Sequence, residues 1–109
     1  MVVENLSPNA TPSLIIGAEL AGTRAETGDI AGAQAIIAEL QPLVDAMPSS
    51  PPTAVLGRAR AIVRLKQGRI GEARRELNAA EAIFREAGVS SEFYLRSLAA
   101  LRARIDATR

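Results

Sequence analysis

Two stretches of the chain, 40 residues apart, carry the same pattern around a glycine. One reads RAETGDIAGAQAII over residues 24–37, and the other reads RLKQGRIGEARREL over residues 64–77. A glycine between two apolar helical patterns is typical of a sharp turn between antiparallel helices, because it reaches the left-handed backbone region without steric cost. The echo therefore predicts repeated helical hairpins. The positions that recur in register are Arg24 and Arg64, Gly28 and Gly68, Ile30 and Ile70, and Ala33 and Ala73.

Apolar residues recur at spacings of three and four along most of the chain, which predicts an all-α fold of about five helices. We expect helices over about 11–27, 30–47, 52–67, 70–87 and 91–107. Pro42 falls inside the second helix, where the missing N–H should kink or interrupt it, and the resumed apolar pattern favours a kink. Residues 1–10 show no period and predict a flexible lead-in, so a single helical domain should span 11–109.

The composition excludes several classes of site. Of 109 residues, 48% are hydrophobic but only 3% are aromatic, and 21 are alanine, which suits closely packed helices. The chain has no cysteine and no histidine, so disulfides, thiolate metal sites and imidazole bases are excluded. We expect no metal and no cofactor. Because no pair of carboxylates and no glycine-rich loop after a strand is evident, we also expect no enzymatic activity.

The near-neutral net charge of +1 hides an asymmetry. Residues 1–53 carry one basic and six acidic side chains, for a net charge of 1 − 6 = −5, whereas residues 54–109 carry twelve basic and six acidic, for 12 − 6 = +6. Glutamates alternate with the arginines of the second half at helical spacings, which favours solvated, locally paired helix faces over a nucleic-acid surface. The polarity between halves predicts a salt-dependent head-to-tail or twofold dimer.

Three aromatic side chains lie near the junction of the last two expected helices: Phe84, Phe93 and Tyr94. Helix-period stripes of this kind are more often core than ligand site. We therefore expect all three to pack at that junction.

The stretches ETGDIAGAQAIIAEL and LKQGRIGEARRELNAAEAIF resemble the inter-helix turn and second helix of the tetratricopeptide repeat, a helical hairpin of about 34 residues that stacks into a solenoid. The resemblance covers two units, at about 14–47 and 54–87, and a closing helix at about 91–107. The chain departs from the pattern where Gly17 and Gly57 replace an early aromatic. The alternative is an ordinary four- or five-helix bundle with a chance echo.

The resemblance implies a groove, lined by the first helix of each unit, that binds a protein or peptide. Arg58 and Lys66 lie about two turns apart and are suited to meet acidic groups of a partner; the alternative is that both are merely solvated. Gly22 stands where the chaperone-binding members need an asparagine, so chaperone binding is not expected. The implied groove positions are Ile15, Ala18, Gly22 and Glu26 in the first unit, and Val55, Arg58, Ile62 and Lys66 in the second.

The leading hypothesis is a non-enzymatic adaptor that binds a protein or peptide partner, with self-association as one form of it. A rival hypothesis is a sensor module for a small ligand or signalling peptide, which an apolar pocket between the two hairpins would favour. A nucleic-acid accessory protein is the least favoured. No pattern of a secretory signal or a membrane span is present, so the cytoplasm is the expected location.

Overall fold

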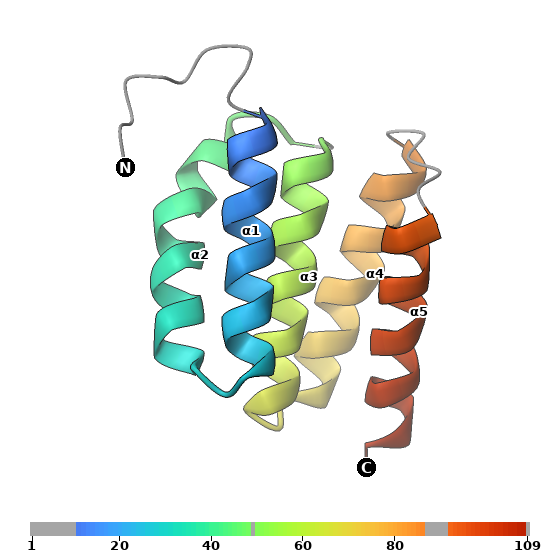
Figure 1. The fold of residues 1–109 in the computed structure, drawn as a ribbon. Coiled ribbons are helices and arrows are strands. Elements are labelled where there is room, and N and C mark those ends of the chain that lie inside the picture. Colours follow the sequence, from blue (N-terminus) through green and yellow to red (C-terminus); the bar gives the residue numbers. More distant parts are fainter. Residues whose placement is uncertain (1–10, 49, 87–91, 109) are drawn as a thin grey trace.

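Five α-helices make up the described part of the chain, which comprises residues 11–48, 50–86 and 92–108 of a computed structural model. The all-α prediction is confirmed, and the observed helix ends lie close to the expected ones. The predicted lead-in at 1–10 and the positions 87 and 91 lie outside the described residues. The helices are α1 (Thr11–Glu26), α2 (Ile30–Asp45), α3 (Pro51–Lys66), α4 (Ile70–Glu86) and α5 (Glu92–Ala107) (Figure 1).

The helices pack as adjacent antiparallel pairs (Figure 1). The pairs α1–α2 and α3–α4 form two hairpins, and α3 is the central element because it packs extensively on both α4 and α1. It touches α2 less, while α5 lies at the far end, against α4 and lightly against α3. The hairpins are therefore stacked mainly through the contact of their first helices.

The 40-residue echo corresponds to two turns with the same geometry. In the first turn, Gly28 has a φ of +93°, and the backbone N–H of Asp29 donates to the carbonyl of Arg24 at 2.8 Å. The second turn repeats both features, with a φ of +77° at Gly68 and the equivalent 2.8 Å hydrogen bond. A left-handed glycine with this bond pattern is the usual helix stop. The sequence pattern thus encodes one local structure twice.

Small residues in the core let the helices approach closely. A methyl group on Gly17 of α1 would lie 3.0 Å from Cδ1 of Leu40 in α2, and one on Gly57 of α3 would lie 3.4 Å from Cβ of Ala80 in α4. These glycines stand where the repeat resemblance places an aromatic, so close helix contact replaces a large side chain there. The largest fully buried side chains include Phe84, Leu56, Ile62, Leu77, Leu98 and Ile105.

Two local expectations have different outcomes. Helix α2 runs from Ile30 to Asp45 without a break, so Pro42 does not interrupt it. Of the three aromatic residues, Phe84 is buried and Tyr94 is half-buried, but Phe93 is 66% exposed. The prediction that Phe93 belongs to the core is therefore wrong. One residue along a helix is a rotation of about 100°, which moves Phe93 out of the stripe that Tyr94 begins.

None of the helices in the described part of the chain combines the length and the apolar character that crossing a lipid bilayer requires.

The two glycine-dependent turns can be tested by substitution. Gly68→Ala should lower the free energy of unfolding by about 1 kcal/mol, because an L-residue is strained at positive φ. Gly71→Ala is the matched control: that position lies inside α4, and neither added methyl group meets an atom within 4 Å. It should raise stability by about 0.5 kcal/mol. Denaturant unfolding measures both, and an unaffected Gly68→Ala variant would contradict the turn geometry.

Candidate functional site

The predicted groove positions fall into two groups in the structure. Four of them are buried in the core: Ala18, Gly22, Val55 and Ile62. These residues are not available to a partner in this conformation. The others reach the surface to different extents: Ile15, Glu26 and Arg58 are half-buried, and Lys66 is exposed.

Gly22 brings α1 and α3 together at Arg58. A methyl group on Gly22 would lie 3.2 Å from Nη1 of Arg58 and 3.7 Å from Cδ1 of Ile62. The glycine thus makes room for the guanidinium beside α1. Lys66 lies eight residues further along α3, which is about 12 Å on a helix, so it is not part of this contact.

The polar contacts of the Arg58 side chain do not fully offset the cost of its burial. Its Nε is buried and has no hydrogen-bond partner among the described residues. Burial lowers the pKa of the Arg58 guanidinium below its ordinary value, and the nearby carboxylates of Glu26 and Glu19 offset this only in part. A buried N–H without a partner costs about 1–3 kcal/mol, so the burial of this atom opposes folding.

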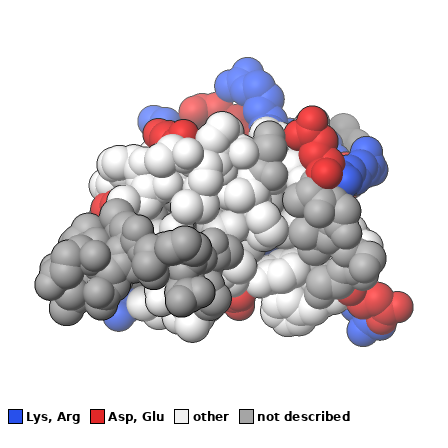
Figure 2. Space-filling model, turned by 90° about the horizontal axis from the view of Figure 1, so that it is seen from above, with Lys and Arg blue, Asp and Glu red and all other residues white. Residues whose placement is uncertain are grey.

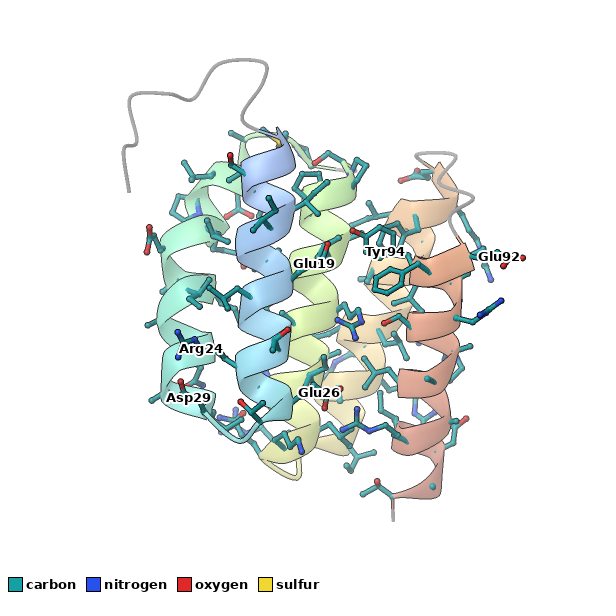
Figure 3. All side chains as sticks on the ribbon, viewed as in Figure 1. Glu19, Arg24, Glu26, Asp29, Glu92 and Tyr94 are labelled. Carbon is teal, nitrogen blue, oxygen red and sulfur yellow. The ribbon has the colours of Figure 1, made fainter. Side chains whose placement is uncertain are left out.

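Two polar contacts join α1 to α5 across the position of Arg58. The hydroxyl of Tyr94 donates to Oε1 of Glu19 at 2.8 Å, and Nη1 of Arg104 donates to Oε2 of Glu26 at 2.7 Å. Figure 3 shows Glu19 directed from α1 toward Tyr94 on α5. We call these five side chains the Arg58 cluster. Residues of α5 bind both carboxylates, Glu19 and Glu26. The guanidinium of Arg58 is therefore the group of the cluster whose hydrogen-bonding capacity is least used.

Tyr94 connects the cluster to the core. Its ring stacks on that of Phe84, with centroids 5.2 Å apart, while Phe93 meets it edge-on at 5.3 Å. Burial, and then the hydrogen bond to Glu19, raises the pKa of Tyr94 to about 12. The neutral phenol is the form that can donate to the carboxylate, so this contact needs a protonated Tyr94.

Sequence reasoning found Arg58 and Glu26 but missed Glu19, Tyr94 and Arg104 as members of the site. The sequence predicts that Tyr94 packs at the aromatic junction and that the arginines of the second half, which include Arg104, lie on solvated faces. Their partners lie 75 and 78 residues away along the chain, and no local pattern encodes such contacts.

Most charged side chains of the described residues are paired, some within one helix or its turn and others between neighbouring helices. Figure 2 shows acidic and basic side chains lying next to one another at the edges of a largely uncharged surface. This pairing supports the solvated-face interpretation of the arginines. The ion pairs within 4.0 Å among the described residues are Arg24–Asp29, Arg60–Glu76, Arg64–Glu72, Arg69–Glu72, Arg74–Asp106, Arg85–Glu81, Arg96–Glu92, Arg102–Glu81 and Arg104–Glu26.

Within the described ranges, no group of three or more acidic side chains is placed to hold a metal ion. Comparison with known proteins gives no significant match to a family model, to a curated protein or to a solved structure. Over the described residues, the chain is an all-α domain of five helices in adjacent antiparallel pairs.

The Tyr94–Glu19 contact can be measured directly, because Tyr94 is the only tyrosine and the chain has no tryptophan. Phenolate absorbance should titrate near pH 12 in the folded protein and near pH 10 in denaturant. Because the folded pKa lies above the unfolded one, stability should fall as the pH rises from about 10 to 12.

Glu19→Gln should bring the Tyr94 pKa closer to 10, because it removes the negative charge that opposes phenolate formation. The matched control, Glu92→Gln, changes an exposed carboxylate that pairs with Arg96 and should leave the titration in place. Circular dichroism at each pH separates titration from unfolding. A folded wild-type protein that titrates near pH 10 would disprove the contact.

Proposed function

We propose that the chain is a non-enzymatic interaction module, a short helical repeat of the tetratricopeptide type that binds an acidic segment of a protein or peptide partner at the Arg58 cluster. The duplicated glycine turns and the stacking of the two hairpins through α1 and α3 support the repeat interpretation. The binding role rests on one observation, which is the half-buried guanidinium of Arg58 between α1 and α5, whose Nε has no hydrogen-bond partner among the described residues.

A guanidinium presents five N–H donors in a planar fork that fits a carboxylate. Glu19 and Glu26 are the carboxylates that act electrostatically on Arg58, but they already bind Tyr94 and Arg104. The N–H donors of Arg58 are therefore not fully used. An acidic side chain or a terminal carboxylate of a partner would pair with the part of this guanidinium that reaches the surface.

Exposed apolar side chains adjoin this cluster on both helices. Ile16 and Leu20 of α1, on either side of Glu19 in the sequence, are 69% and 45% exposed. Phe93 is 66% exposed and lies eleven residues before Arg104, three helical turns, so it shares the side of α5 that reaches α1. Large apolar groups around a charged centre are typical of interaction surfaces.

If Arg58 is retained for binding, its removal should not weaken the fold. Arg58→Met keeps the apolar stem and removes the buried Nε, which has no partner among the described residues, and we expect the free energy of unfolding to rise by about 1 kcal/mol. Arg60→Met is the matched control on the same helix: Arg60 pairs with Glu76 at 3.1 Å, so its loss should destabilise the protein. Denaturant unfolding compares the two. A marked loss of stability in Arg58→Met would show that Arg58 has a structural role instead.

Binding can be tested with peptides selected from a random display library against the full chain. We expect enrichment of acidic peptides, and fluorescence anisotropy should show at least about tenfold weaker binding to Arg58→Gln than to wild type. Arg69→Gln, which alters an exposed arginine in the turn between α3 and α4, should bind as wild type does. Failure to enrich any peptide, or equal affinity for Arg58→Gln, would refute the proposal.

A further inference from the structure

A small cavity of about 220 Å³ opens between α2 and α3, at the seam between the two hairpins. Its surface is mainly apolar. Val63 is almost fully buried, Ile37 is half-buried against the core, and Ala38 is exposed at the mouth. The polar part of the lining includes Gln41 of α2 and the arginines Arg60 and Arg64 of α3.

This cavity is separate from the Arg58 cluster. Arg60 lies two residues after Arg58, a rotation of about 200° around α3, so the two side chains leave the helix in opposite directions. Arg64 lies four residues, or about one turn, after Arg60, so its side chain leaves α3 on the same side as that of Arg60. A ligand in the cavity would therefore contact α2 and α3, and none of the residues of the Arg58 cluster lines it.

The two arginines are held to different degrees. Arg60 is fixed, because its Nε donates to Glu76 at 3.1 Å and its Nη1 donates to the side-chain oxygen of Gln41. Arg64 is held loosely: its Nε lies 3.8 Å from Glu72, and its Nη1 donates to Gln67 at 3.4 Å. Glu72 is also shared with Arg69, at 3.8 Å. Arg64 thus has donors available to a new acceptor.

We infer that this cavity binds a small monocarboxylate with a compact apolar body, such as an aromatic acid. An apolar cavity of about 150 Å³ holds a benzene molecule, so 220 Å³ leaves room for a ring and a carboxylate. The ring would lie against Ile37, Ala38 and Val63, and the carboxylate would pair with Arg64. A single negative charge suits the site, because Glu72 and Glu76 already offset part of the charge of the neighbouring arginines.

The test is a titration of the isotope-labelled full chain with phenylacetate, followed by NMR. We expect saturable shifts confined to amides of α2 and α3, and at least about tenfold weaker binding of phenylacetamide, which lacks the charge. Arg64→Gln should weaken phenylacetate binding to a similar extent. Arg69→Gln is its matched control, because Arg69 shares Glu72 but does not line the cavity.

A second pair of variants tests the apolar part. Ala38→Phe should fill the mouth and abolish binding, whereas Ala35→Phe, at an exposed position of α2 outside the cavity lining, should bind as wild type does. An acetylated tripeptide ending in phenylalanine distinguishes a free acid from a protein C-terminus.

No saturable binding of phenylacetate, equal binding of the acid and the amide, or binding of the tripeptide alone would each overturn the inference. Arg58→Gln, which should weaken peptide binding at the other site, should leave phenylacetate binding unchanged. Failure here is therefore distinguishable from failure of the proposed function.

Discussion

The arrangement of the whole molecule depends on the close contact between α1 and α3. Small residues on both helices make that contact possible, and Ala18, Ala21 and Ala59 are completely buried in it or beside it. Because Gly22 has no side chain, the guanidinium of Arg58 fits against α1. A larger residue at position 22 would have to displace that guanidinium or separate the hairpins. The packing of the two hairpins and the position of the candidate site therefore have the same physical cause.

The charge asymmetry of the sequence is partly resolved inside the molecule. The acidic first hairpin supplies Glu19 and Glu26, and the closing helix supplies the phenol and the guanidinium that meet them. These contacts attach the far end of the chain to the first helix across α3. The charge asymmetry of the sequence predicts attraction between two copies of the chain. Part of that charge instead makes contacts within one copy. The predicted dimer stays a prediction, with a smaller electrostatic contribution than the net charges of −5 and +6 imply.

Local features of the fold were predictable from the sequence, and long-range ones were not. Gly28 and Gly68 mark their turns because a positive φ is a property of one residue and its neighbours. Whether Ala18 or Val55 faces a groove or the core depends on how closely a second helix approaches, which helical spacing alone does not determine. The same holds for Glu19, whose partner lies 75 residues away. Arg58 is identifiable by type and position, but the lack of a partner for its Nε among the described residues follows only from packing.

The central position of α3 explains why both candidate sites are built on arginine. Nine of its 16 residues are buried, against three or four in each of α2, α4 and α5. A helix enclosed in this way has few directions in which a charged side chain can reach water, and these are the seams between its neighbours.

Arg58 leaves through the seam facing α1 and α5, and Arg60 and Arg64 leave through the seam facing α2. Each seam has apolar walls, because it is formed by the sides of helices that also build the core. A guanidinium above apolar walls is the combination that recognises a carboxylate carried on an apolar group. Both candidate sites thus depend on arginines carried by the most buried of these helices.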